Sequence, residues 1–522
     1  MRFLTTSQCS NKKIISDLNN YSFSIISFLL ITSGVFVIAL SLAPIRLTSA
    51  NYGMDGGDLL AAILTGGVPH PTGYPSYMLL GRLFQNVPYG TPVFRASLLS
   101  LIPAALAAGL STMWAGFWEE RAHPGVIVSG LVVGLTWGTS PLFLSQAVIV
   151  EVHGLQSLFI ILALFGIFLL LKYPELTSGK YLFPALALAY GIGLGNHLTL
   201  LLLLPAYGMA IIYAKQTRMS LRLTLVLLAF MLTGTLVYFY LPLQARHYPP
   251  VNWGNPQSWK GFLWLVTASP YRGLLFNTPP STLLERLGAW FNLLRQQFGV
   301  AGLALGAAGA TLMSSADKRQ TGMLLWVFVV YSFFALVYNT ADSTAFLIPA
   351  CLVFSLWIGY AILSFWDMSW RKVSSGKLLS IAMLAYLILR IPTTSHQIDP
   401  RNTTLPDEFA RTLLEAAPTD ALVLTQSDAD TFPLWYYHFG LGWREDLAVI
   451  ALPLTHFVWY QETLLHTYLD LKFPDFSIQD EAATAWGEQI PSLNPGRAVC
   501  RSQVDSADPL AISYTCQNSP AP

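Results

Sequence analysis

Charged residues are scarce in this chain of 522 residues. Asp, Glu, Lys and Arg make up 11% of it, hydrophobic residues make up 53%, and the mean hydropathy is +0.50. Soluble domains are about a quarter charged, so this chain cannot cover itself with a polar surface, and we expect lipid to be its main solvent. The formal net charge of +1 lacks the strongly basic balance that suggests a nucleic-acid partner.

Cysteine is also rare, with four residues and no CxxC or His-rich metal signature. Cys9 precedes the first apolar run and Cys351 lies inside one. Cys500 and Cys516 share a polar C-terminal region, and an oxidising compartment would allow them to pair. The chain has no Walker A sequence, which argues against an ATP-driven pump, and it has neither GxSxG nor HExxH.

The chain contains many long uncharged stretches, which predict about eleven bilayer spans of about 20 residues each. The first, over about 21–43, follows two lysines and lacks a small-residue cleavage site, which indicates an anchor rather than a signal peptide. The uncharged run over 181–214 is too long for one helix, so we expect two short helices that meet near Asn196 and His197. The other expected spans lie near 93–115, 125–146, 153–171, 221–243, 298–315, 321–338, 345–365 and 376–391.

Positive charge marks alternate connections between these spans, which are cytoplasmic by the positive-inside rule. The other connections, and everything after about residue 392, are then outside. An odd number of spans also leaves the C-terminal region outside, where its two cysteines can be oxidised. The charged set is Arg2, Lys12, Lys13, Arg121, Lys172, Lys180, Lys215, Arg218, Arg222, Lys318, Arg319, Arg371, Lys372 and Lys377. The outer connections are 46–92, around 147–152, around 196–197, 244–297 and 339–344.

The chain divides into a membrane module over residues 1–391 and an outer soluble domain over 392–522. In the second region short apolar runs alternate with helical patterns, which argues for a small α/β unit. The stretch from about Pro491 is rich in Pro, Ser and Asn, so we expect it to be loose. The expected strands cover 421–425 and 447–452, and the expected helices cover 405–416 and 455–468.

Two carboxylates, Asp55 and Asp58, lie just beyond the first span. A group-transfer enzyme needs a carboxylate that takes the proton from an attacking hydroxyl, and this outer loop could supply it at the membrane surface. The spacing fits equally well a helix start, with Asp55 as N-cap and Asp58 at the third helical position.

Further polar residues stand at span ends or in outer loops. Ionisable groups at membrane boundaries are often functional, although interface or helix-junction roles are the alternative. Loop arginines suit a phosphate leaving group. Asp428 and Asp430 follow an expected strand, where α/β folds place ligands, and helix capping by Asp430 is the plainer alternative. Residues 283–298 pattern as an amphipathic interfacial helix. The candidates are His70, Tyr74, Glu151, His153, Asn196, His197, Arg246, Trp253, Tyr271, Arg272 and Asp342.

Several of these segments together resemble one family. Asp55-Gly-Gly-Asp58 with His70-Pro-Thr-Gly-Tyr-Pro75 resembles the D-S-G-E … H-P-P-G-Y-P signature of the domain-of-unknown-function 2723 family, which includes transmembrane protein O-mannosyltransferases. Other matches follow in order and extend over roughly residues 50–450. They are Glu151-Val-His-Gly-Leu155, Gly195-Asn-His-Leu-Thr199, Asn252-Trp-Gly-Asn-Pro256, Tyr271-Arg272, the segment from Tyr338 to Pro349, and the segment from Ser427 to Tyr436.

The resemblance implies a GT-C membrane glycosyltransferase. Such an enzyme takes a sugar, here mannose or another hexose, from a polyprenyl-phosphate carrier and attaches it to an acceptor on the outer or lumenal face. Asp55 would be the base, and Arg246 or Arg272 would stabilise the phosphate. The acceptor would be a hydroxyl, such as Ser or Thr of an exported protein, or a glycan. Asp58 stands where the family has Glu, and His153 stands where Tyr is common.

Other interpretations stay open. A divalent metal ion held by Asp55, Asp58 and Glu151 is allowed but not required. A transporter or flippase for lipid-linked sugars is the main alternative function, and it predicts ionisable residues at mid-membrane and inverted repeats. A non-catalytic membrane scaffold is the third. The expected location is a bacterial inner membrane with the site outside, or the endoplasmic reticulum membrane in a eukaryote.

Overall fold

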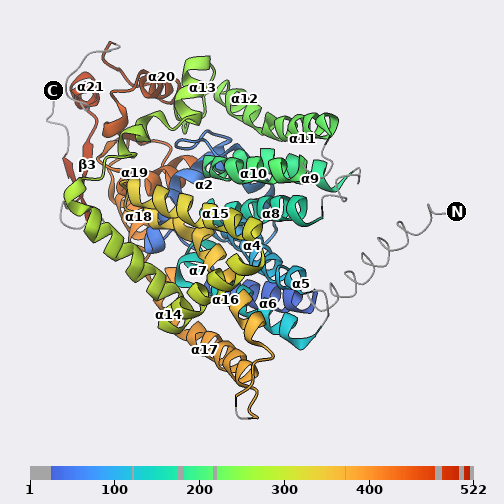
Figure 1. Cartoon of the computed structure of the whole chain (residues 1–522). Coiled ribbons are helices and arrows are strands. Elements are labelled where there is room, and N and C mark those ends of the chain that lie inside the picture. Colours follow the sequence, from blue (N-terminus) through green and yellow to red (C-terminus); the bar gives the residue numbers. More distant parts are fainter. Residues whose placement is uncertain are drawn as a thin grey trace.

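The computed structural model describes residues 25–119, 123–173, 181–215, 220–370, 372–475, 485–504 and 511–517. It is mostly helical, and the C-terminal elements gather at one end of the helices (Figure 1). Four helices lie side by side, namely α8 (His153–Lys172), α9 (Leu182–Leu194), α10 (Leu204–Lys215) and α11 (Leu221–Gly234). Some residues on which the predicted orientation rests lie outside the described part of the chain, as does Cys9. These are Arg2, Lys12, Lys13, Arg121, Lys180, Arg218 and Arg371.

Eight helices of the described residues are long and apolar enough to cross a membrane. A ninth span forms if α6 and α7, which meet at 66°, count as one broken helix. Two shorter apolar helices meet at Asn196 and His197, as expected. The expected eleven spans therefore match eleven apolar segments, of which eight are long and apolar enough to cross a membrane. The long segments are Ile25–Leu42, Pro92–Trp118, His153–Lys172, Leu221–Ala245, Pro280–Ala316, Lys318–Val337, Ser343–Phe365 and Ser375–Ala416.

Helix α16 (Ile348–Phe365) is the centre of the membrane part. It is apolar on all sides and packs against α6, α14 and α15, so it is a core helix. The other helices here are α2 (Gly56–Thr65), α3 (Pro75–Phe84), α4 (Pro92–Thr112), α5 (Ala115–Trp118), α6 (Pro124–Gly138), α7 (Pro141–Ala147), α8 (His153–Lys172), α9 (Leu182–Leu194), α10 (Leu204–Lys215), α11 (Leu221–Gly234), α12 (Tyr240–Ala245), α13 (Trp259–Val266), α14 (Leu283–Ala316), α15 (Lys318–Val337) and α17 (Ser375–Ile398).

Helix α14 joins two elements that the sequence analysis separated. The predicted amphipathic helix over 283–298 and the predicted span over 298–315 form one helix, broken at Gly299. Gly299 has φ 67°, a left-handed conformation that glycine adopts without a Cβ penalty. The helix therefore kinks at this glycine, which lies where the two predicted segments meet.

The C-terminal region forms the predicted α/β unit around a four-stranded sheet of order β2-β1-β3-β4. Strands β1 (Leu422–Thr425) and β2 (Ala448–Ala451) are parallel and lie where short apolar runs predicted them. The expectation of a loose stretch after Pro491 is wrong for the described residues there, because β3 (Val499–Val504) pairs with β1 and with β4 (Ile512–Gln517). The helices are α18 (Leu405–Ala416), α19 (Asp428–Trp435), α20 (Val458–Thr467), α21 (Ala485–Glu488) and α22 (Ile490–Leu493).

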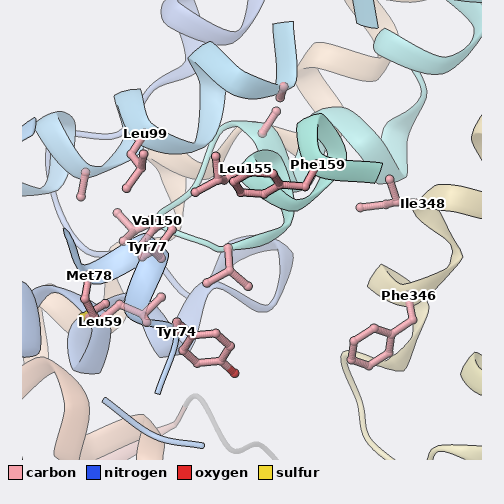
Figure 2. Close-up of a cluster of buried hydrophobic side chains, with 14 of the residues drawn as sticks. Leu59, Tyr74, Tyr77, Met78, Leu99, Val150, Leu155, Phe159, Phe346 and Ile348 are labelled. Carbon is pink, nitrogen blue, oxygen red and sulfur yellow. The ribbon is translucent and has the colours of Figure 1, made fainter. Parts of the chain in front are cut away.

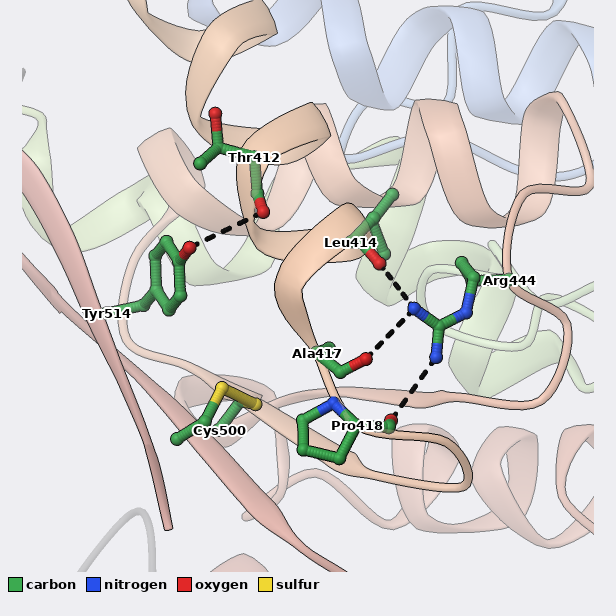
Figure 3. The surroundings of a disulfide bond; sticks show 8 residues. Thr412, Leu414, Ala417, Pro418, Arg444, Cys500 and Tyr514 are labelled. Atoms are coloured by element: carbon green, nitrogen blue, oxygen red, sulfur yellow. Dashed lines mark hydrogen bonds between the residues drawn. A yellow bond between two sulfur atoms is a disulfide. The ribbon is translucent and has the colours of Figure 1, made fainter.

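A disulfide and a set of arginine hydrogen bonds stabilise this unit (Figure 3). The Cys500–Cys516 disulfide joins β3 to β4, so the pairing allowed by the sequence is present. Arg444 donates hydrogen bonds to the carbonyl oxygens of Leu414, Ala417 and Pro418. Because the last carbonyls of a helix lack partners within it, the guanidinium caps α18.

Candidate active site

A cavity of about 530 Å³ lies where the membrane helices meet the C-terminal unit. Each of the five outer connections, and the region after residue 392, contributes residues to its wall. The structure therefore gathers segments that the sequence analysis grouped only by the positions of Lys and Arg. The candidates that line the cavity are Asp55, His70, Tyr74, Glu151, His153, His197, Tyr271, Arg272 and Asp342.

Asp58 lies beneath the cavity floor and holds the imidazole of His70. It is fully buried in α2, and its Oδ2 accepts from the His70 backbone N–H at 2.9 Å and lies 2.7 Å from His70 Nδ1. Its Oδ1 accepts from Trp253 Nε1 at 3.0 Å. Trp253 reaches this point because backbone hydrogen bonds join Val68 to residues 251 and 253. Both carboxylate oxygens of Asp58 are therefore engaged.

The partners of His70 identify it as an imidazolium. Nδ1 donates to Asp58, while Nε2 lies 3.1 Å from the hydroxyl oxygen of Tyr74, whose own proton goes to the carbonyl of Pro71. Each ring nitrogen thus faces an oxygen that can accept, which favours a ring that carries both protons. Burial disfavours the charged ring, but Asp55 and Asp58 outweigh burial and raise the pKa of His70 to about 9.

Asp55 faces the cavity beside this imidazolium. Its Oδ2 lies 3.7 Å from His70 Nε2, and its side chain is 37% exposed. It occupies the N-cap position of α2 but makes no side-chain capping bond, and Asp58 bonds to His70 instead of the helix start. The predicted helix start is therefore confirmed, but neither carboxylate makes the capping bond that this interpretation expected. Burial raises the pKa of Asp55, and the positive charge of His70 opposes this rise.

Rings and carboxylates form the wall on the membrane-helix side. His197 lies between Tyr74 and His153, with ring centroids 6.1 Å and 6.0 Å away, and Phe346 lies 5.6 Å from His197. Figure 2 shows Tyr74 at the edge of the packed cluster, with Phe346 across from it. Glu151 precedes α8 and is buried; burial and the charge of Asp55 raise its pKa to about 8. Asp342 begins the short helix Ser343–Leu347 on the same wall.

Arg272 is the arginine that the structure brings to the cavity. It lies in the short helix Ser269–Leu274 with Tyr271, and its guanidinium donates to the hydroxyl of Thr267. Arg246 is exposed at the end of α12 and does not line the cavity, so the structure does not support it as a phosphate partner.

Two further candidates support the wall from behind. Asn196 is fully buried and donates to the carbonyl of Val152 and to the side-chain oxygen of Gln156, so it fixes the junction between α8 and the two short helices. Trp253 is buried against Asp58. Asp58, Asn196 and Trp253 thus position the lining residues without facing the cavity themselves.

The suggested metal ligands do not fit an ion. Among the described residues no group of three or more His, Cys, Asp or Glu side chains is arranged to hold one. Asp58 already uses both oxygens for Trp253 and His70. The trio of Asp55, Asp58 and Glu151 is therefore not a ligand set in this geometry.

The C-terminal unit also supplies lining residues, of which the sequence analysis considered Asp428, as a residue after a strand end, but not Phe432. Asp428 and Phe432, both on α19, face the cavity. The ring of Phe432 stacks with His70 at 6.3 Å, and an added Cβ on Gly57 would lie 2.4 Å from the Phe432 carbonyl oxygen. Asp430 caps α19 through a capping box with Ser427, as its spacing predicted. Asp428 follows a strand end, and that was the available signal.

Family comparisons match two of the regions that line this cavity, whereas its residues from Thr267 to Phe346 lie outside both matches. A family described as the protein O-mannosyl-transferase TMEM260 N-terminal domain matches residues 55–220, and TMEM260-associated domain 2 matches residues 406–478. Protein O-mannosyl-transferase TMEM260 of Mus musculus is 26% identical over 479 residues, 84% of this chain and 65% of that protein. The Dictyostelium discoideum protein of the same name is 22% identical over 473 residues, 81% and 57% respectively. The chain thus spans less than two thirds of the length of these relatives.

Solved structures resemble the whole fold. ArnT from Cupriavidus metallidurans in the apo state has a TM-score of 0.58 at 12% identity, and its undecaprenyl phosphate complex has 0.57 at 11%. Each covers 92% of this chain and 93% of its own. At such low identity the likeness shows the fold, and it confirms the expected GT-C architecture of a multi-pass membrane protein.

Proposed function

Because the chain resembles the protein O-mannosyl-transferase TMEM260 family in both matched regions, we propose that it is a membrane glycosyltransferase. It moves mannose or another hexose from a polyprenyl-phosphate carrier to a hydroxyl, such as Ser or Thr of an exported protein. The reaction takes place on the outer or lumenal side of the membrane. The observation that carries the proposal is the Asp55 carboxylate facing the cavity next to the imidazolium of His70.

The transfer is a single displacement. The acceptor oxygen forms a bond to the anomeric carbon, the bond from that carbon to the phosphate oxygen breaks, and polyprenyl phosphate leaves. Asp55 takes the proton of the acceptor hydroxyl. Because the anomeric carbon undergoes one displacement, its configuration inverts. The His70 imidazolium keeps Asp55 ionised before the reaction, and Arg272 neutralises the charge that develops on the phosphate.

The remaining lining residues suit a sugar next to Asp55. The rings of Tyr74, His197 and Phe346 offer faces and edges for the apolar side of a pyranose. Glu151 and Asp342 offer oxygens for sugar hydroxyls. Leucines on the membrane-helix side suit the first isoprene units of a carrier, namely Leu198, Leu201, Leu202, Leu274 and Leu275.

A reconstituted assay tests the function. The purified chain in lipid nanodiscs is mixed with polyprenyl-phosphate mannose and a Ser/Thr-rich peptide or a folded exported domain, and the products are analysed by mass spectrometry. We expect a gain of one hexose on the acceptor. Two results together would refute the transferase and support a lipid-linked-sugar transporter: no acceptor gains a hexose, and the labelled donor moves across the membrane of proteoliposomes.

A smaller prediction concerns the contact between α2 and α19. Gly57→Ala places a Cβ against the backbone of Phe432, at 2.4 Å from its oxygen and 2.5 Å from its carbonyl carbon. Overpacking of this kind costs about 1–3 kcal/mol, and displacement of α19 should lower hexose transfer about tenfold. Gly322→Ala is the control, because an added Cβ there meets nothing within 4 Å. Equal transfer by both variants and the wild type would show that the α2–α19 contact does not shape the cavity.

A further inference from the structure

Asp428 lines the cavity, but the proposed transfer reaction does not use its carboxylate. Asp428 is the first residue of α19 and is exposed toward the cavity. No hydrogen bond or ion pair joins its side chain to another residue in the described ranges, whereas Asp430, two residues later, bonds to the backbone of Gln426 and Ser427. Asp428 is therefore presented on a fixed helix start with its oxygens available.

The helix that carries Asp428 is held rigidly over the site. Asp430 also accepts from the hydroxyl of Ser502 in β3, which ties α19 to the sheet. On the opposite side the Phe432 backbone packs against Gly57, and its ring stacks with His70. A residue on a helix that is held from both sides can position a ligand with little loss of backbone entropy.

Asp55 interacts electrostatically with carboxylates on two sides of the cavity, one in the membrane part and one in the outer unit. Glu151 interacts electrostatically with Asp55 and Asp342 on the membrane-helix side. Asp428 interacts with Asp55, and burial together with that charge raises its pKa to about 7. The pKa of Tyr271 is raised by burial and by Asp428. The leucines that suit a lipid carrier belong to the short helices and loops next to the membrane spans, whereas Asp428 belongs to the outer unit.

We propose that Asp428 binds the acceptor, and that its carboxylate accepts hydrogen bonds from main-chain N–H groups of the peptide next to the attacked hydroxyl. The inference rests on the proposed function, because it assigns the second substrate of the same reaction to the Asp428 side of the cavity. Peptide N–H groups donate readily to a carboxylate, and such charge-assisted bonds are about twice as strong as neutral ones. The soluble unit thus supplies part of the active site as well as a cover for it.

Asp428→Ala and Asp428→Asn test this assignment in the full-length protein. We expect Asp428→Ala to raise the KM for a Ser-containing peptide about tenfold, the effect of one lost hydrogen bond to a charged group, and to raise it at least five times more than the KM for the lipid donor. Asp428→Asn retains an accepting oxygen and should recover part of the loss. Glu415→Ala, on the exposed surface of α18, is the control.

Peptides methylated on the backbone nitrogens beside the acceptor residue sharpen the test. In the wild type, N-methylation should raise the peptide KM about tenfold, and in Asp428→Ala it should add less than twofold, because the partner is already gone. Equal sensitivity of both proteins, or equal rises in donor and acceptor KM, would overturn the assignment while leaving the transferase function intact. Absence of transfer by the wild type would instead refute the proposed function.

Discussion

Asp55→Asn is expected to lower hexose transfer by about 10³-fold, because the amide cannot take the acceptor proton and removal of a general base costs about 10²–10⁴-fold. The substitution keeps the size and shape of the side chain, so donor binding should change much less than kcat. The measurement is the initial rate of hexose addition to a peptide at saturating donor.

Asp420→Asn is the matched control for that result. Asp420 is exposed on the C-terminal unit and has φ 58°, a conformation that asparagine tolerates well. The Asp420→Asn variant should transfer hexose at the wild-type rate. If Asp55→Asn also transfers hexose at the wild-type rate, another group removes the proton, and Asp55 is not the base.

Asp58→Asn is expected to have the second largest effect, about 10²-fold on kcat, although Asp58 does not face the cavity. Its two carboxylate oxygens accept from Trp253 and from His70, whereas an amide offers one accepting oxygen. The His70 ring then loses its fixed orientation and part of the negative charge that stabilises its proton. A misplaced imidazolium would leave Asp55 less ionised and less well oriented.

The pH profile separates this positioning role from simple damage to the fold. In the wild type the pKa of His70 is raised to about 9. Hexose transfer should therefore fall as the pH rises through that value, because the ring loses its charge. Removing the Asp58 charge lowers the pKa of His70, so the alkaline limb of kcat/KM should move to lower pH in Asp58→Asn. A variant with reduced activity but an unmoved alkaline limb would mean that Asp58 acts only on stability.

Local patterns in the sequence predicted most of the elements correctly. Long apolar runs predicted the membrane helices, and short apolar runs predicted β1 and β2, because both kinds of element consist of consecutive apolar residues. Strands β3 and β4 were missed: they are half-exposed, and their pairing depends on contacts with residue 422 and its neighbours far away in the chain. The number of continuous spans was overestimated, since composition does not show where helices α6 and α7 bend.

The candidate site shows the same division between local and long-range information. Loop position selected the residues that line the cavity, but it could not distinguish Arg272, which reaches the cavity, from Arg246, which does not. The capping and catalytic interpretations of Asp55 and Asp58 had identical spacing. Only the approach of His70 and Trp253 from other segments shows that Asp58 is a buried acceptor and that Asp55 is the carboxylate left facing the cavity.

The hydrogen bond between Asp430 and Ser502 has a consequence for the order in which the protein matures. Asp55 and His70 are synthesised early, but the wall opposite them rests on β3, which pairs with β4 and is linked to it by the Cys500–Cys516 disulfide. A ribosome must therefore translate residues 499–517, and that hairpin must form, before the cavity is complete. If the proposed function holds, a partly made chain has its proton acceptor but not its full acceptor-binding wall, and transfer begins only after the C-terminal strands are made.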